Sequence, residues 1–351
     1  MRSQSSPQLA SEALQMLIAP LSAEQFFRDY HEKSHFHGAV SHTAMEELLT
    51  IDRIDEIIAD NELPPSSIAM AKSGQSINPA EYTFANEVVD RGAVLDGFRD
   101  GSTIILPQLH LADGKLYEFC LSLEKAFGAR TQTNIYMTPP GEHGFDVHYD
   151  DHDVFVLQVA GAKDRDIYGS RESLPYRGES FRKGHDDVGE LEAEFCLDQG
   201  QCLYVPRGTA HRAQTPGSEP SLHITVGILV QTWADFLLEA VAEASLRIPE
   251  LRQSLPRDLF FETENRDAYM AQFKQAASAI VDKASFEANL AAFSGNFVRS
   301  QGGRVRGGLA VQLQNRIKSR SLAKSDFTVD DAEELDDVIG TLVAYGLLTR
   351  D

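Results

Sequence analysis

The chain has 351 residues and a formal net charge of −21, with 42% hydrophobic and 24% charged residues. This length and composition are those of a globular protein with one large domain and one or two smaller ones. The acidic balance argues against nucleic acids and anionic membranes as partners and favours basic ones. Three cysteines without CxxC spacing argue against a disulfide scaffold. No stretch approaches the roughly 20 apolar residues of a membrane span, and we expect a cytoplasmic protein.

Helical spacing of apolar residues gives way to short strand-like segments along the first two thirds of the chain. Residues 11–60 carry apolar residues three and four positions apart, which predicts helices. A turn and a buried strand are expected over 100–110, followed by an amphipathic helix over 117–128. From 132 to 230, segments rich in β-branched and aromatic residues alternate with Gly, Pro and Asp clusters. This region predicts an antiparallel sandwich or barrel and an α+β fold class.

The chain divides into three expected parts. Residues 1–230 form the barrel domain with its N-terminal helices. Residues 231–299 are helical again, with a continuous apolar stripe that we expect to pack on the barrel or to form the interface of a homodimer. Residues 300–351 begin with a glycine-rich linker and end in a small module that resembles a winged helix. Its acidity makes DNA binding improbable, so we expect an interaction or packing module.

The most informative motif is His148-Tyr149-Asp150, within the strand-rich region. Alternate side chains of a β-strand point to the same side, so His148 and Asp150 can reach one ion. His211 follows the segment YVPRG, where the end of a strand can aim a side chain into the mouth of a barrel. Two imidazoles and one carboxylate can occupy one face of octahedral Fe(II), leaving three sites for a cosubstrate and oxygen. The set therefore predicts an oxygenase.

Other ligand sets remain open from the residues alone. His152 shares strand parity with His148, so parity does not exclude a pairing of Asp150 with His152. His143 and His223 are further candidates, although a hydrogen-bonded core histidine is the favoured interpretation of His223. Zinc also takes imidazole and carboxylate ligands, so a zinc hydrolase is the main alternative.

Several motifs together resemble those of a known family. They are NIYMTPPG (134–141), HYDDHDVFVLQ (148–158), GAK (161–163), YVPRGTAH (204–211) and SLHITVG (221–227). On these residues the chain resembles the JmjC-type Fe(II)/2-oxoglutarate oxygenases, and among them the ribosomal oxygenase (ribosomal-protein hydroxylase) branch. The resemblance covers roughly residues 20–230.

This resemblance implies a double-stranded β-helix (cupin jelly roll) in which His148, Asp150 and His211 hold iron. It also implies that Lys163 binds the distal carboxylate of 2-oxoglutarate, a role that suits an ammonium in a partly dry pocket. Asn134 matches a family asparagine close to the cosubstrate. Tyr136 shares its strand parity, and Thr225 is a weaker candidate from the last barrel strand. These three polar residues can also serve as hydrogen-bonding partners in the core.

The implied activity is hydroxylation of a protein side chain, with the arginine or histidine of a ribosomal protein as the expected substrate. Alternatives are the hydroxylation of a small molecule or amino acid, lysine demethylation, and a non-catalytic metal-binding cupin. Two departures concern the substrate pocket. Arg165 stands where the branch has a tryptophan, and Gly227 stands where it has a polar residue.

Overall fold

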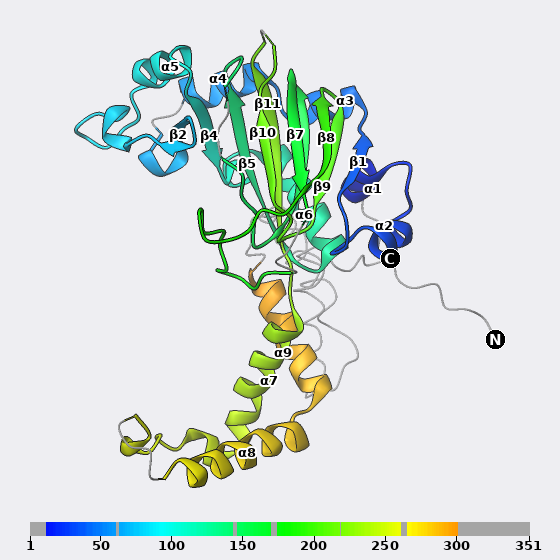
Figure 1. Cartoon of the computed structure of the whole chain (residues 1–351), viewed down its shortest axis with the longest axis vertical. Coiled ribbons are helices and arrows are strands. Elements are labelled where there is room, and N and C mark those ends of the chain that lie inside the picture. The colour runs from blue at the N-terminus through cyan, green and yellow to red at the C-terminus, as the bar shows by residue number, and fades with distance from the viewer. Residues whose placement is uncertain are drawn as a thin grey trace, which may run out of the picture. The chain divides into compact units, whose positions relative to one another are not determined.

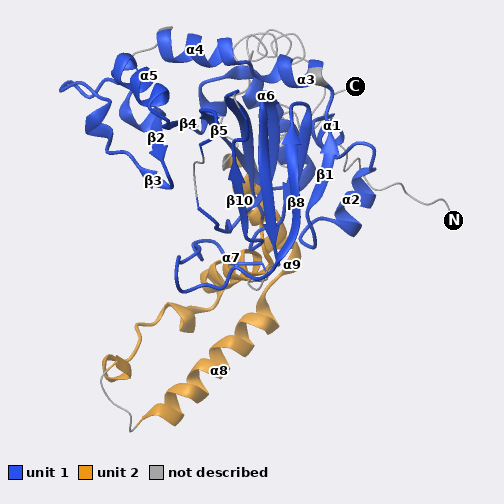
Figure 2. Ribbon diagram, turned by 45° about the horizontal axis from the view of Figure 1, so that its top comes forward, with its two compact units in different colours: residues 1–230 blue, residues 231–351 orange. Residues whose placement is uncertain are grey.

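A computed structural model of the chain describes residues 12–60, 63–142, 146–169, 174–217, 219–260 and 265–300. The chain divides into two units, Met1–Val230 and Gln231–Asp351 (Figure 2). The expected winged-helix-like module lies outside the described residues, as does the candidate His143.

The first unit begins with helices interrupted by short strands. In chain order they are α1 (Glu12–Ile18), α2 (Ala23–Asp29), β1 (Phe36–Ala39), α3 (His42–Leu48), α4 (Ile51–Asp60), η1 (Pro65–Ser67), β2 (Ala69–Lys72), β3 (Gln75–Ser76), η2 (Pro79–Glu81), α5 (Arg91–Arg99), β4 (Thr103–Pro107), η3 (Leu109–Leu111) and α6 (Gly114–Phe127). The helices predicted in the first 60 residues, the strand near 105 and the helix that ends at Gly128 are confirmed.

The ends of α6 show how the local sequence sets these bounds. The Asp113 carboxylate accepts hydrogen bonds from the backbone amides of Lys115 and Leu116, which are among the amides that lack a partner within the helix. At the other end, Gly128 adopts a φ of 59°, a left-handed conformation that glycine enters without steric cost. The next residues can therefore turn directly into a strand.

Seven strands follow α6. They are β5 (Arg130–Thr138), β6 (Asp153–Ala160), β7 (Ala162–Tyr168), β8 (Leu191–Asp198), β9 (Gln201–Val205), β10 (His211–Gln214) and β11 (Ser221–Leu229). With the earlier strands they build an eight-stranded sheet of order β1-β9-β6-β11-β5-β4-β2-β3 and a three-stranded sheet of order β10-β7-β8 (Figure 1). Every pairing between these strands is antiparallel. The predicted α+β class and antiparallel β-architecture are confirmed.

The alternation of side chains along β6 separates two cores. Phe155 and Leu157 point to a large apolar core that includes residues of α1, α2 and α6. Val154 and Val156 point the other way, into a smaller cluster with Ile167 and other residues of the three-stranded sheet. A β-strand buried on both faces carries consecutive apolar residues, as VFVL (154–157) in β6 does. The second face is the one that carries the candidate site.

The second unit is helical within its described residues, as expected. It contains α7 (Trp233–Arg247), η4 (Pro249–Arg252), η5 (Arg257–Phe260), α8 (Arg266–Lys283) and α9 (Phe286–Ser300). The ring of Phe236 in α7 contacts those of Phe286 and Phe293 in α9, with centroids 5.6 and 5.4 Å apart. No described helix combines the length and the hydropathy needed to cross a bilayer.

Many large apolar side chains of this second unit are exposed. Trp233, for example, has 76% of its surface accessible, and α8 buries no residue. The others are Leu237, Leu238, Val241, Leu246, Leu255, Leu259, Phe260, Met270, Phe273, Val281, Phe286 and Leu290.

Candidate active site

The three predicted metal ligands converge in the first unit. One donor atom from each of His148, Asp150 and His211 lies within 4.8 Å of the others, and no other group of His, Cys, Asp or Glu with this spacing occurs among the described residues. His211 Nε2 lies 3.8 Å from Asp150 Oδ2, and the two imidazole centroids are 4.7 Å apart. His152, the alternative partner of Asp150 as a metal ligand, is not a member of this group.

Backbone pairing explains how residues far apart in sequence meet. His148 and His211 form an isolated antiparallel bridge, with N–O distances of 3.2 and 2.8 Å in the two directions. The amide of Gly208 also donates to the carbonyl of Asp150 at 2.9 Å. The expectation that His148 and Asp150 share a regular strand was wrong, because β6 begins only at Asp153. The short bridge, rather than a continuous strand, brings the three side chains together.

Hydrogen bonds fix which nitrogen of each histidine faces the cluster. Nδ1 of His148 donates to the carbonyl of Asp146 at 2.8 Å, and Nδ1 of His211 donates to the carbonyl of Thr209 at 3.0 Å. A carbonyl only accepts, so both Nδ1 atoms carry hydrogen in the neutral ring and both Nε2 atoms carry the lone pair. Metal-binding histidines commonly have this arrangement. Burial, aided by the nearby His148, lowers the pKa of His211 to about 4, so its imidazole is neutral near pH 7.

The three side chains open onto a cavity of about 310 Å³ between the two sheets, and all the candidate site residues line it. Its lining consists of Thr103, Asn134, Tyr136, His148, Asp150, His152, Val154, Val156, Lys163, Arg165, His211, Ala213, His223 and Thr225.

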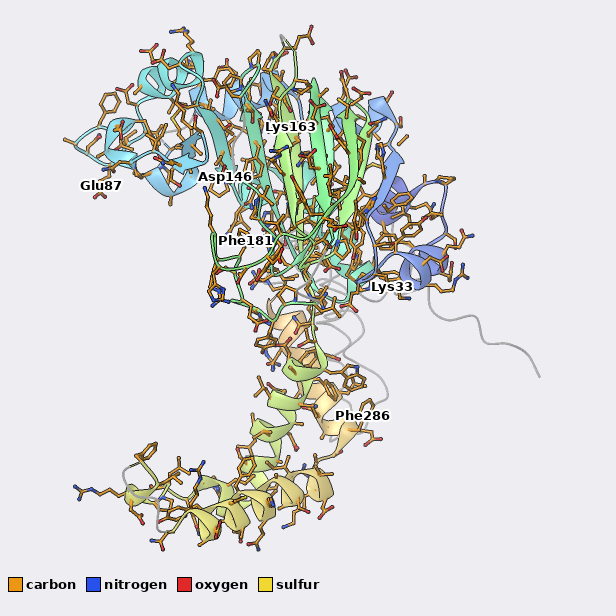
Figure 3. The ribbon with its side chains drawn as sticks, in the orientation of Figure 1. Lys33, Glu87, Asp146, Lys163, Phe181 and Phe286 are labelled. Carbon is orange, nitrogen blue, oxygen red and sulfur yellow. The ribbon has the colours of Figure 1, made fainter. Side chains whose placement is uncertain are left out.

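Lys163, labelled among the strands in Figure 3, lines this cavity. It is buried, with 3% of its surface accessible. Its Nζ donates to Oγ1 of Thr138 at 2.9 Å, and burial, followed by the charge of Arg165, holds the pKa of the lysine well below its ordinary value. Thr138 was missed as a site residue. It shares strand parity with Asn134 and Tyr136, so the alternation along β5 was the signal that could have found it.

The other polar candidates sit on β5 and β11. Oδ1 of Asn134 accepts from the backbone amide of Gln108 at 3.1 Å, which gives it a structural role as well. Tyr136 stacks on His223 with centroids 4.9 Å apart and an interplanar angle of 10°, and burial raises its pKa to about 12. Thr225 lies directly opposite Asn134 in the register of β5 and β11.

The remaining histidine candidates line the cavity outside the cluster. Nδ1 of His152 lies 3.0 Å from Oδ1 of Asp151, which orients the ring beside the cluster. His223 is buried, its Nδ1 has no hydrogen-bond partner, and burial holds its pKa well below the ordinary value. His223 is thus a buried core histidine, as expected, but the expected hydrogen bond of its side chain does not occur among the described residues.

Comparison with known proteins agrees with these observations. The family model of the JmjC domain matches residues 109–236, which contain every candidate site residue. A Dictyostelium discoideum protein described as a bifunctional lysine-specific demethylase and histidyl-hydroxylase NO66 is 29% identical over 267 residues, covering 71% of this chain and 50% of the relative. Ribosomal oxygenase 1 of Gallus gallus is 30% identical over 292 residues, covering 77% of this chain and 47% of the relative.

A solved structure of YcfD, a ribosomal oxygenase from Escherichia coli in complex with cobalt and 2-oxoglutarate, aligns with a TM-score of 0.48 at 14% identity, covering 79% of this chain and 71% of that one. The chain spans half or less of the length of the two curated relatives named above. The family match and the similarity to these relatives establish that this chain is a JmjC domain protein related to the ribosomal oxygenases.

Proposed function

We propose that the chain is an Fe(II)- and 2-oxoglutarate-dependent oxygenase that hydroxylates a protein side chain. The observation that carries this proposal is the convergence of His148, Asp150 and His211 in a cavity that also buries Lys163. In 2-oxoglutarate, the keto-acid end would bind the metal held by the three ligands, and the distal carboxylate would bind Lys163.

The donor set fits Fe(II). The two imidazole Nε2 atoms and one carboxylate oxygen would hold the ion and leave room for the cosubstrate and oxygen. When bound, the iron and 2-oxoglutarate supply the chemistry, in which oxygen is consumed, 2-oxoglutarate becomes succinate and carbon dioxide, and a C–H bond is hydroxylated. A zinc hydrolase needs the same ligands but gives no reason for a buried lysine in the cavity.

The chain's own residues would bind and orient the cosubstrate. In this proposal Lys163 pairs with the distal carboxylate, and Thr138 holds the ammonium in place. The phenol of Tyr136, whose pKa is raised to about 12, remains a neutral hydrogen-bond donor at working pH. Asn134 and Thr225 face the same space from opposite strands. Burial of these groups keeps water out and strengthens each polar contact.

The substrate class is proposed from the relatives and the charge. The printed names of the relatives include histidyl-hydroxylase and ribosomal oxygenase. A net charge of −21 favours encounter with a basic protein, and ribosomal proteins are basic as a class. We therefore place a histidine or arginine of a ribosomal protein first. Hydroxylation of a small molecule comes next, and lysine demethylation, which the relatives' name also mentions, is the third possibility. A non-catalytic cupin would not require the complete ligand set.

The test uses the full chain loaded with Fe(II) without oxygen and then mixed with 2-oxoglutarate, oxygen and ribosomal proteins. We expect succinate and a protein product heavier by one oxygen atom. His211→Ala should abolish both, whereas His185→Ala, which changes an exposed histidine away from the cavity, should retain them. Absence of succinate and of the heavier product with the unaltered chain would contradict the proposal.

We also propose that the chain is a homodimer that buries the exposed apolar side chains of α7, α8 and α9. Apolar area of this extent is uncommon on a free surface. Sedimentation at micromolar concentration should give twice the mass of one chain, and replacement of Phe273 by Glu in α8 should shift the mass toward one chain. A single-chain mass for the unaltered protein would contradict this proposal.

A further inference from the structure

The second cation of the cavity, Arg165, has no partner for its charge among the described residues. Its side chain lines the cavity with 4% of its surface accessible. Both Nε and Nη2 are buried without a hydrogen-bond partner. Burial lowers the pKa of the guanidinium to about 10, so it still carries its charge near pH 7. A buried cation without a counter-ion is unfavourable, and folded proteins ordinarily pair such a charge.

The acidic residues next to Arg165 on β7 do not neutralise it. Asp164 and Asp166 alternate with it along the strand and therefore point to the opposite face of the sheet. Asp166 pairs there with Arg212, whose Nε donates to Oδ2 at 2.8 Å. Within the cavity the single carboxylate is that of Asp150, which belongs to the proposed metal ligands. The charge of Arg165 is therefore available to a ligand.

A second cation lies beside it on the same face of β7. Lys163 is two residues away, so both side chains point into the cavity, and its Nζ contacts the neutral hydroxyl of Thr138. In the register of β10 and β7, His211 pairs with Ile167 and Ala213 pairs with Arg165. Along this face of β7, Arg165 therefore lies between the position opposite His211 and Lys163. A lysine and an arginine in one cavity match a ligand with two carboxylates, because a bound carboxylate favours the protonated form of Lys163.

We infer that Arg165 is a second carboxylate-binding residue of this cavity, so that Lys163 and Arg165 together hold a dicarboxylate. The inference rests on the proposed function for the identity of the acid, 2-oxoglutarate. The planar guanidinium can make two parallel hydrogen bonds to a carboxylate, which an ammonium cannot, so it constrains the orientation of the acid as well as its charge. Arg165 stands where the ribosomal oxygenase branch has a tryptophan, and it would then help to determine which acids the cavity binds.

The test measures binding rather than turnover. Full-length protein, both metal-free and loaded with Mn(II), is titrated calorimetrically with 2-oxoglutarate, with succinate and with the monocarboxylate 2-oxobutyrate. Arg165→Met removes the charge and keeps the length of the side chain. Arg212→Met is the matched control, because that arginine lies on the outer face of the same sheet, paired with Asp166. Arg165→Lys retains the charge without the planar fork.

For Arg165→Met we expect an affinity for 2-oxoglutarate and succinate in the Mn(II)-loaded protein lower by about 10- to 100-fold, the loss of one charge-assisted contact. The loss of affinity for 2-oxobutyrate should be smaller. Arg165→Lys should retain part of the affinity for the two dicarboxylates that Arg165→Met loses. The melting temperature of the ligand-free Arg165→Met protein should stay level or rise, because an unpaired buried charge has been removed. A purely structural arginine would instead lower it.

Wild-type affinity for both dicarboxylates in Arg165→Met would overturn the inference. So would equal losses for Arg165→Met and Arg212→Met, or failure of the unaltered protein to bind a dicarboxylate in either metal state. Dicarboxylate binding that depends on Arg165 but yields no hydroxylated product would leave the inference standing and contradict the proposed function. If the unaltered chain hydroxylates its substrate and Arg165→Met binds dicarboxylates as tightly as the unaltered chain, the proposed function stands and this inference is overturned.

Discussion

The imidazole of His152 occupies the space that a side chain at position 227 would need. A Cβ on Gly227 would lie 2.7 Å from Cδ2 and 2.9 Å from Nε2 of that ring. Asp151 holds the ring in place through Nδ1, at 3.0 Å. The glycine of the last barrel strand and the histidine beside the proposed metal ligands therefore depend on each other. The departure at Gly227 has a physical reason, since His152 fills that part of the cavity wall.

Gly227→Ala should therefore destabilise the protein by overpacking, by about 1–3 kcal/mol of unfolding free energy. In a His152→Ala background the same change should cost much less, because the clashing ring is gone. Chemical unfolding of the four proteins of this double-mutant cycle measures the coupling. Additive effects of the two substitutions would show that the ring and the glycine are independent.

Thr138→Val should weaken the anchoring of Lys163. The hydroxyl of Thr138 accepts the hydrogen bond from Nζ inside the buried cavity, and valine has nearly the same shape without the acceptor. Leaving the amine unsatisfied should cost about 1–3 kcal/mol of unfolding free energy and raise the Kd for 2-oxoglutarate. Thr138→Ser, which keeps the hydroxyl, is the control in calorimetry and urea unfolding. Equal behaviour of the two variants would show that the hydroxyl has no role.

His223 should make the stability of the ligand-free protein depend on pH. Burial holds its pKa well below the ordinary value, and the charges of Lys163 and Arg165 push it the same way. The unfolded chain takes up a proton below about pH 6.5 and the folded chain does not, so stability falls as the pH drops from about 6.5 toward the lowered pKa. The slope from this one group is at most about 1.4 kcal/mol per pH unit.

His223→Phe keeps a ring stacked on Tyr136 and removes the titration. Urea unfolding at a series of pH values between about 7 and 5 should therefore favour the variant, relative to the unaltered protein, increasingly as the pH falls. Parallel stability curves for the two proteins would mean that His223 does not remain neutral in the folded state.

Asp153→Asn should destabilise the protein at the start of β6, the strand that follows the proposed metal ligands. The fully buried Asp153 carboxylate accepts from the hydroxyl of Tyr204 at 2.7 Å and from Nη1 and the backbone amide of Arg207, both at 3.1 Å. Loss of one charge of a buried pair is expected to cost about 3–5 kcal/mol. Glu32→Gln removes the second, more exposed partner of Arg207 and should cost less in the same denaturant titration. A larger cost for Glu32→Gln would contradict this ranking.

The sequence predicted the members of the His148, Asp150 and His211 group but not how the group is assembled. Residue types left other histidines open, and the family resemblance selected these three, whereas the helices and strands followed from periodicity. The bridge between His148 and His211 depends on the register of segments far apart in the chain, and no local pattern contains that register. The regular strand expected at His148 and Asp150 was therefore wrong, although both ligands reach the cluster.

The burial of Arg165 was the other feature that the sequence did not predict. The alternation along β7 places Lys163 and Arg165 on one face, but parity alone does not tell whether that face is wet or dry. The three-stranded and eight-stranded sheets close over it and leave Arg165 without a counter-ion. In the same way, the contact between His152 and Gly227 depends on the pairing of β11 with β6, which no local pattern contains.

The central claim is tested most directly by adding 2-oxoglutarate to the Fe(II)-loaded chain in the absence of oxygen and recording the visible absorption. Chelation of the ion by the keto acid should produce a charge-transfer band that saturates at one iron per chain. This band should be absent in His211→Ala and intact in His185→Ala. A protein that binds no Fe(II), or binds it without the band, would contradict the assignment of His148, Asp150 and His211 as the iron site of a 2-oxoglutarate oxygenase.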